Sequence, residues 1–226
     1  FNENAETDNQ GPRIEMYIND TTFREGGITG PNPVLYANIS DENGINTVGN
    51  GIGHDLIAYV DNREDVKVLN DYYVSDLNRY NEGTVTYPFF NLPEGDHTLY
   101  LKAWDVHNNS TEASLDFKVV SKDRFKIQRL LNYPNPVTDY TNFVFEHNQK
   151  GQQLDIEIQI FNSRGRLVKT INKSIFAGGY KINPVKWRGD SSYGAELRKG
   201  VYVYKVTVKT ADGLVAEKSN KLLLIR

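Results

Sequence analysis

The chain has 226 residues and a net charge of −3, and it contains no cysteine. The missing cysteine excludes a disulfide framework, a thiolate metal cluster and a cysteine nucleophile within these residues. Hydrophobic residues make up 38% and aromatic residues 12%, which is enough to fill folded cores, so a disordered chain is excluded as well. The length suits one large all-β domain or two domains of about a hundred residues each.

The net charge hides an asymmetry between the two halves. Residues 1–122 carry 8 Lys and Arg against 20 Asp and Glu, giving −12, whereas residues 123–226 carry 18 against 9, giving +9. This division predicts one domain at 1–122 and a second at 123–226. The basic half suits an anionic partner, such as lipopolysaccharide or an acidic protein face; the alternative is attraction between the halves themselves.

Alternation of apolar and polar residues dominates the first half and predicts strands. The clearest runs are RIEMYI at 13–18, VLYANIS at 34–40, HTLYLKAW at 97–104 and SLDFKVV at 114–120. Stretches rich in Gly, Pro, Asn and Asp separate these runs, and the connection at 63–77 has room for one short helical turn. Short strands divided by such turns predict an Ig-like β-sandwich.

The segment YPNP at 133–136 is expected to interrupt the ladder. Proline has no backbone N–H to donate, and the residue before a proline is restricted to an extended conformation. We therefore expect an extended segment without ladder pairing, followed by a turn at VTDYT (137–141) into the first strand of the second domain. The two domains are expected to join near residues 121–127.

The second half repeats the period of two. Its runs are NFVF at 142–145, DIEIQIF at 155–161, LVKTI at 167–171, GVYVYKVTVK at 200–209 and KLLLIR at 221–226. DIEIQIF places Ile156, Ile158 and Ile160 on one inner face, and Arg164-Gly165 supplies a hairpin turn. The whole chain is predicted to be all-β, with two tandem Ig-like β-sandwich domains.

Residues suited to catalysis are sparse. The four histidines, at positions 54, 97, 107 and 147, form no HExxH or similar metal-binding group, and no GxSxG stretch is present. The adjacent His54 and Asp55 are interpreted as ordinary hydrogen-bonding groups. We predict no catalytic residue and no cofactor in this chain.

Two loops are candidates for a calcium site. DENGIN at 41–46 and DVHNNS at 105–110 place Asp41, Asn43 and Asp105 where oxygen ligands alternate, as hard cations require. Neither loop completes the EF-hand pattern. Asp and Asn side chains also cap their own turns without a metal, which is the alternative interpretation.

The second half resembles the C-terminal sorting domain of the type IX secretion system. YPNP and TNFVF (141–145) open the resemblance, IQIFNSRGRLVKTI (158–171) matches its strand–turn–strand core, and WRGDSSYGAELRKGVYVYKV (187–206) matches its Trp- and Gly-rich pattern. One position is displaced, because Asp190 follows Gly189 directly. The motif residues, interpreted as turn and core residues rather than reactive groups, are Pro134, Asn135, Pro136, Gly165, Trp187, Gly189, Asp190, Gly194, Leu197, Gly200 and Tyr202.

The first half resembles the segment that follows the peptidase domain in the sortase of the same pathway, a gingipain-like cysteine peptidase. The resemblance lies in GPRIEMYIND at 11–20, ISDENGINTVGNGIGHD at 39–55 and the stretch 69–119. It implies a non-catalytic C-terminal region of a surface enzyme that removes sorting domains from cargo and couples the cargo to anionic lipopolysaccharide. No catalytic residue is carried over, because the chain has no cysteine.

The resemblance also implies partners and a location. The expected partners are the outer-membrane β-barrel PorV, the type IX translocon and anionic lipopolysaccharide; no nucleic-acid partner and no transmembrane segment are expected. The expected location is the cell surface, at the outer membrane, after passage through the periplasm. The alternative is the cleavable sorting region of a secreted cargo protease or adhesin; a carbohydrate-binding sandwich is disfavoured because no cluster of exposed Trp is evident.

Overall fold

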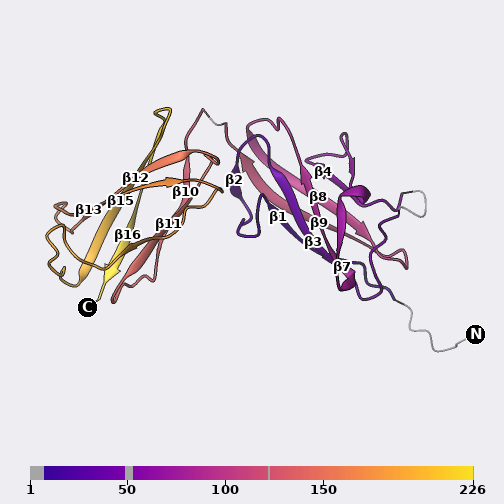
Figure 1. Ribbon diagram of the computed structural model, residues 1–226, viewed down its shortest axis with the longest axis horizontal. Coiled ribbons are helices and arrows are strands. Elements are labelled where there is room, and N and C mark those ends of the chain that lie inside the picture. Colours follow the sequence, from indigo (N-terminus) through magenta and orange to yellow (C-terminus); the bar gives the residue numbers. More distant parts are fainter. Residues whose placement is uncertain (1–7, 49–52, 122, 226) are drawn as a thin grey trace, which may run out of the picture. The chain divides into compact units, whose positions relative to one another are not determined.

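The computed structural model describes residues 8–48, 53–121 and 123–225. The chain divides into two compact units, unit 1 from Phe1 to Val119 and unit 2 from Val120 to Arg226 (Figure 1). Within the described residues the one helical element is the 3-10 turn η1 (Asn70–Tyr72), and everything else regular is β-strand. The predicted all-β, Ig-like class is confirmed.

Unit 1 contains a four-stranded and a five-stranded sheet. The first sheet runs in the order β1 (Arg13–Ile18), β3 (Val34–Ser40), β7 (Arg79–Pro88), β6 (Tyr73–Asp76). The second runs in the order β2 (Gly27–Thr29), β9 (Ser110–Val119), β8 (Gly95–Trp104), β4 (Ile57–Val60), β5 (Lys67–Val68). All pairings are antiparallel except β2 with β9, which is parallel.

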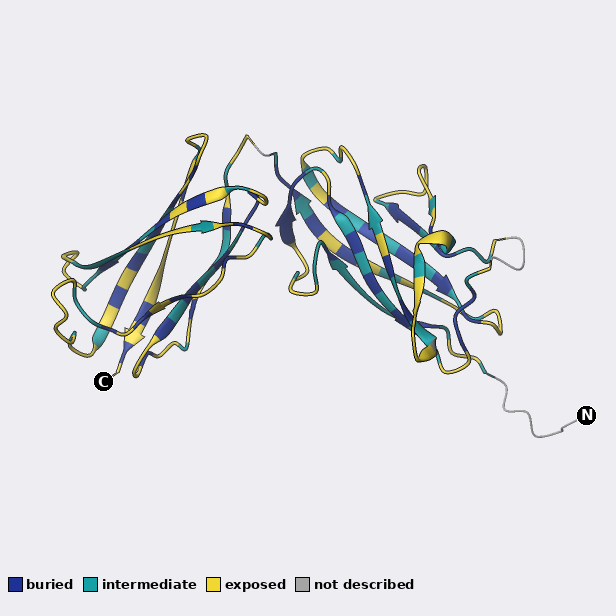
Figure 2. Cartoon of the chain, viewed as in Figure 1, coloured by how far each residue is buried: buried dark blue, intermediate teal, exposed yellow. Residues whose placement is uncertain are grey.

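The core of unit 1 follows from the alternation in its sequence. Leu35, Ala37 and Ile39 of β3 are buried against Leu99 and Leu101 of β8, in a single cluster that draws on both sheets. The side chains between them on the strands are more exposed, so buried and exposed residues alternate along the strands in Figure 2. Period-two patterning therefore determines which face of each strand is inside.

Unit 2 contains a three-stranded and a four-stranded sheet. The first runs in the order β10 (Ile127–Tyr133), β11 (Thr141–His147), β14 (Val185–Trp187). The second runs in the order β13 (Leu167–Phe176), β12 (Gln153–Phe161), β15 (Gly200–Thr210), β16 (Val215–Leu224). Ile156, Ile158 and Ile160 are buried, as predicted, and they join Phe143 and Tyr204 in one core cluster.

The first strand of unit 2 corrects the sequence-based expectation. We expected the first strand after the YPNP segment, but β10 precedes that segment and pairs with β11. The register shifts between Gln128 and Leu131, and Arg129 has a positive φ of 45°. This irregularity removes the clean alternation that identifies a strand in sequence, which is why the pattern did not reveal β10.

Asn148 holds the segment that leads into β10. It is 1% exposed, and its side-chain amide donates to the carbonyls of Ser121 at 2.9 Å and Arg124 at 2.7 Å. Its side-chain oxygen accepts from the backbone N–H of Lys126 at 2.8 Å. A buried amide that makes three such bonds fixes where the chain enters unit 2.

No helix in the described parts of the chain has the length and hydropathy required to cross a bilayer.

Candidate functional site

The sorting-motif residues converge on one end of unit 2, which we call the motif pole and define as residues 133–140, 162–168, 186–200 and 221–225. Four strand pairs mark this end: Tyr133 with Asn142, Thr141 with Trp187, Phe161 with Leu167, and Gly200 with Leu224. In Figure 1 it is the end of unit 2 that carries the label C. Segments up to ninety residues apart in sequence thus form one local structure.

The YPNP segment joins the two sheets of unit 2 at this pole. Both of its prolines follow cis peptide bonds. The side-chain oxygen of Asn135 accepts from the N–H of Leu223 at 3.0 Å, and its side-chain amide lies 3.4 Å from the carbonyl of Lys221. Val137 then forms a parallel bridge with Leu224, in which its N–H donates to the carbonyl of Leu223 at 2.7 Å. The expectation that YPNP takes no part in a ladder is wrong at Tyr133, which ends β10 and pairs with Asn142, whereas Pro134 to Pro136 belong to no strand. The contact with the last strand is made by the Asn135 side chain and by the isolated bridge at Val137.

A buried pair of polar residues supports the same segment. Thr141 is fully buried, and its hydroxyl donates to the carbonyl of Pro134 at 2.8 Å. Asn132 donates from its side chain to the Thr141 hydroxyl at 3.1 Å. Neither residue was identified from the sequence, because an isolated Thr or Asn in a strand carries no signal that it will bond to a turn.

Trp187 and Asp190 anchor the long loop between β14 and β15. Trp187 is 2% exposed, and its Nε1 donates to the backbone carbonyl of Asp190 at 3.0 Å. The Asp190 carboxylate forms an ion pair with Lys169 of β13, and Lys169 also donates to the carbonyl of Ser191 at 3.2 Å. The displaced Asp of the motif therefore tethers the loop to the neighbouring strand; Lys169 was not predicted to take part.

The rest of the loop turns back toward β15. The N–H of Leu197 donates to the carbonyl of Gly189, and the N–H of Gly194 to that of Ser191. Tyr202 closes the loop, because its hydroxyl donates to the carbonyl of Arg198 at 2.7 Å. Burial raises the pKa of Tyr202, so this hydroxyl stays protonated and keeps donating well above neutral pH.

Two glycines of the motif have backbones that other residues rarely adopt. Gly165 lies in the hairpin turn between β12 and β13 with φ of 73°, and its N–H donates to the carbonyl of Asn162 at 2.9 Å. Gly200 starts β15 with φ of 155°. Glycine adopts both values without the strain that a Cβ introduces, which favours glycine at these positions.

The surface of the motif pole is rich in exposed Tyr, Arg and aliphatic side chains. Tyr193, in the loop between β14 and β15, is 97% exposed, and Tyr133 is 73% exposed. Seven Lys or Arg and three Asp or Glu lie within the pole as defined. Tyr and Arg are the residue types enriched in protein-recognition surfaces. The exposed residues of this pole are therefore suited to binding another macromolecule.

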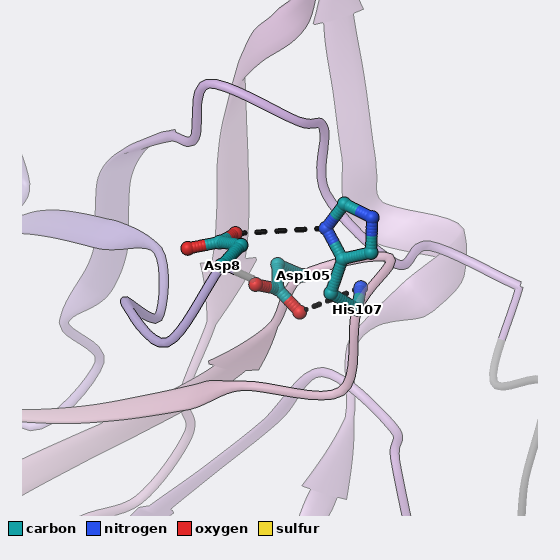
Figure 3. Close-up of side chains that lie close together, drawn as sticks. All are labelled: Asp8, Asp105 and His107. Atoms are coloured by element: carbon teal, nitrogen blue, oxygen red, sulfur yellow. Dashed lines mark hydrogen bonds and ion pairs between the residues drawn. The ribbon is translucent and has the colours of Figure 1, made fainter. Parts of the chain in front are cut away.

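The candidate calcium residues lie in unit 1, where the structure brings them near one another. Asp8, Asp105 and His107 place one ligand atom each within 4.8 Å of the others (Figure 3). Asp41 and Asn43 are linked to this group, because the Asn43 side chain donates to Asp8 Oδ2 at 2.7 Å and its N–H donates to Asp41 Oδ1 at 2.8 Å. Asp8 and His107 were not among the predicted ligands.

Asp105 already has hydrogen-bond partners within its own loop. It is fully buried, and Oδ1 accepts from the N–H groups of His107 at 2.8 Å and Asn109 at 2.7 Å. Oδ2 accepts from the Asn109 side chain at 2.7 Å. Asp41 accepts likewise from the N–H groups of Asn43 and Gly44. These bonds account for both residues as turn caps, and calcium binding stays a prediction.

The pKa of Asp8 is lowered, first by the hydrogen bond from the N–H of Gln10 and further by those from Asn43 and other neighbours. Asp8 lines a polar hollow of about 680 Å³ together with Arg13, Asp41 and His107. The mixed charges of this hollow select no particular ligand.

Most of unit 2 is similar to a known family. Residues 132–218 match the family described as the secretion system C-terminal sorting domain. No curated protein matches the chain.

Several solved structures are similar to the chain. Dimeric latent PorU from Porphyromonas gingivalis is 32% identical and matches 96% of this chain and 20% of its own, with a TM-score of 0.49. Fibronectin(III)-like modules of CbhA from Clostridium thermocellum are 8% identical and match 94% of this chain and 93% of their own, with a TM-score of 0.35. SGBP-B from Bacteroides ovatus, in complex with a mixed-linkage heptasaccharide, is 15% identical and matches 92% of this chain and 45% of its own, with a TM-score of 0.41.

The chain spans about one fifth of the length of that PorU chain. The family match and this identity agree with the motif residues quoted above. Residues 132–218 thus match the family of the secretion system C-terminal sorting domain, and the chain as a whole is similar to PorU from Porphyromonas gingivalis.

Proposed function

We propose that the chain is the non-catalytic C-terminal region of a type IX secretion sortase. Such a sortase is a surface cysteine peptidase that removes sorting domains from cargo and attaches the cargo to anionic lipopolysaccharide. In this proposal unit 2 directs export and docks at the outer membrane on the β-barrel PorV and the translocon, and unit 1 braces the peptidase. The chain contributes no cysteine nucleophile, because it has no cysteine.

The observation that carries the proposal is the convergence of the motif on one pole. The Asn135 side chain of YPNP bonds to Lys221 and Leu223 of the last strand, which pairs with β15 from Gly200 onward. Val168 and Lys169, which follow the turn at Gly165, bond to Ser192 and Ser191 of the loop from Trp187 to Gly200. A translocon that recognised a linear peptide would require none of these bonds. Their presence supports recognition of a folded shape.

Exposed aromatic residues allow a direct test in a cell that secretes through the type IX pathway. Tyr193→Ser and Tyr133→Ser, introduced into the complete protein, change exposed side chains and leave the core intact. We expect surface display to fall, while the purified chain melts at the wild-type temperature. Phe176→Ser is the matched control, because Phe176 is 67% exposed but lies at the opposite end of β13, outside the pole. Normal display of both Tyr variants would contradict docking through the motif pole.

A second measurement separates a sortase from a secreted cargo protein. A sortase is expected to keep unit 2 in its mature form, whereas cargo loses its sorting domain during export. The intact mass of the mature surface protein distinguishes the two. A mass that lacks residues after about 122 would rule out the sortase assignment and leave the cargo alternative.

A further inference from the structure

The outer face of the β13–β12–β15–β16 sheet changes in chemistry along its length. At the motif pole, Leu167, Phe161 and Val203 lie side by side on three adjacent strands, and Val201 lies opposite Leu223 on the next pair. Four of these five are exposed: Leu167 at 45%, Val201 at 51%, Val203 at 36% and Leu223 at 39%. They form an apolar corner at the motif-pole end of this sheet face.

The following rows of the same face are polar. Gln159 pairs with Lys205, which pairs with Ser219, and one row further Thr207 pairs with Glu217. Lys205 is held there by an ion pair with Glu217 at 2.7 Å. These polar rows separate the apolar corner from Phe176 and Val215, which are exposed at the other end of the same face. An exposed apolar patch with a polar surround is typical of an interaction site.

Four exposed cations border the apolar corner. Arg164 and Arg166 lie in the turn that joins Phe161 to Leu167, Lys199 precedes Val201 by two residues, and Lys221 is paired with Val203. All four are exposed. Among residues 8–48, 53–121 and 123–225, no carboxylate forms an ion pair with any of them, in contrast to Lys169, Lys205 and Arg129. Lys181 and Lys209, at the other end of unit 2, likewise have no such partner among the described residues, so the corner differs from that end in gathering four cations around apolar side chains.

We propose that this basic-rimmed apolar corner (Leu167, Val201, Val203 and Leu223 with Arg164, Arg166, Lys199 and Lys221) docks on an anionic lipid surface. The unpaired cations meet lipid phosphates, and the aliphatic side chains enter the adjoining apolar layer. Charge complementarity carries the choice of occupant, because four clustered cations without carboxylate partners among the described residues are attracted to a surface of dense, repeated negative charge. Val and Leu side chains also need no matching hydrogen-bond partners, which suits a lipid layer.

The inference extends the proposed function without depending on it. A unit docked on a membrane β-barrel lies at the level of the surrounding head groups, so lipid contact through the same pole adds to protein contact. Surface display in cells tests docking on the protein partner, and vesicle flotation tests binding to lipid. If one of these proposals is wrong, the experiment on the other is still informative.

The experiment is flotation of the 226-residue chain with vesicles of phosphatidylcholine alone and of phosphatidylcholine with about one third phosphatidylglycerol. We expect binding only to the anionic vesicles, and a steep fall in binding as salt rises. Arg164→Glu with Arg166→Glu is expected to lower the binding constant about tenfold or more. Val201→Asn with Leu223→Asn is expected to lower it while leaving its salt dependence unchanged.

The matched control is Lys181→Glu with Lys209→Glu. These exposed lysines lie at the other end of unit 2, since Lys209 pairs with Asp155 and Lys181 bridges Glu146, and the substitutions change the net charge equally. This variant is expected to bind within about threefold of wild type. Two results would overturn the proposal: wild type that does not bind anionic vesicles at low salt, which would leave an acidic protein as the occupant, or equal losses in both charge-reversed variants.

Discussion

The side-chain oxygen of Asn135 accepts a hydrogen bond from the backbone N–H of Leu223, 88 residues further along the chain, at 3.0 Å. This bond and the neighbouring Val137–Leu224 bridge attach the last strand to the opposite sheet. Removing the Asn135 hydrogen bond tests whether this contact, which we call the clasp, stabilises unit 2. Asn135→Ala is expected to lower the free energy of unfolding of unit 2 by about 1 kcal/mol.

Asn135→Asp provides the control for this clasp. The carboxylate keeps the acceptor that faces Leu223 and loses only the weaker donor to Lys221, at 3.4 Å. We therefore expect a smaller loss than in Asn135→Ala. Equal stability of all three proteins in urea would show that the bond contributes nothing.

The two tryptophans make these measurements specific to one unit. Trp104 lies in unit 1 and Trp187 in unit 2, and the sequence has no others. Trp104→Phe leaves fluorescence that reports on unit 2 alone, and this background is suited to the tests on Asn135, Gly200 and His147.

Gly200→Val is expected to destabilise unit 2 by about 1 to 3 kcal/mol through backbone strain. An added Cβ meets no atom within 4 Å, so the φ of 155° is the sole local cause. Gly178→Val serves as the control, because Gly178 has the same free space without a left-handed φ. A urea midpoint for Gly200→Val as high as that of Gly178→Val would refute the strain argument.

His147 is expected to make unit 2 sensitive to acid. Burial lowers the pKa of His147 from its usual 6.5 to about 4, and its Nε2 has no hydrogen-bond partner among the described residues. Below pH 6.5 the unfolded chain gains a proton that the folded chain does not take up. The stability is thus fully present above pH 6.5 and is lost as the pH falls toward 4.

The expected loss between about pH 7 and pH 4.5 is about 2 kcal/mol from this group. It should disappear in His147→Asn, whatever the overall stability of that variant. His107→Asn, which changes a half-exposed ring in unit 1, should retain the full acid sensitivity of unit 2. An unchanged pH slope in His147→Asn would assign the effect to other groups.

Asp105→Ala is expected to destabilise unit 1 by about 2 to 3 kcal/mol, because it leaves the amides of His107 and Asn109 without their acceptor. Asp105→Asn keeps one oxygen and should lose less. The measurement is urea unfolding followed by Trp104 fluorescence in a Trp187→Phe background, with chelator present.

The same variants test calcium. If the loops act only as turn caps, the melting temperature of the wild type is the same with chelator and with calcium. A rise with calcium that Asp105→Asn abolishes would instead establish the cation site, with Asp8 and His107 as its further ligands.

Local patterning predicted the strand faces but not the contacts that assemble the pole. Ile156, Ile158 and Ile160 alternate without interruption, so their burial is evident from the sequence. Strand β10 escaped prediction because the bulge at Arg129 breaks its period. The pairing of Asn135 with Leu223 also escaped, because no local rule relates residues so far apart.

In the candidate site, too, residues with a local role could be predicted from the sequence and residues with distant partners could not. Residue type alone identifies turn glycines and a core tryptophan as structural, and the structure gives Trp187 and Gly200 those roles. Lys169, Asn132 and Thr141 were missed, since their importance lies in partners on other strands.

The clasp between residues 135–137 and β16 has a consequence for synthesis. A polypeptide interrupted before residue 215 has no β16, so Asn135 and Val137 lack their partners and the edge of β15 stays open. Only a chain translated through this strand displays the finished pole. A receptor that reads this pole would thereby accept completed molecules and ignore prematurely terminated ones, without a separate proofreading step.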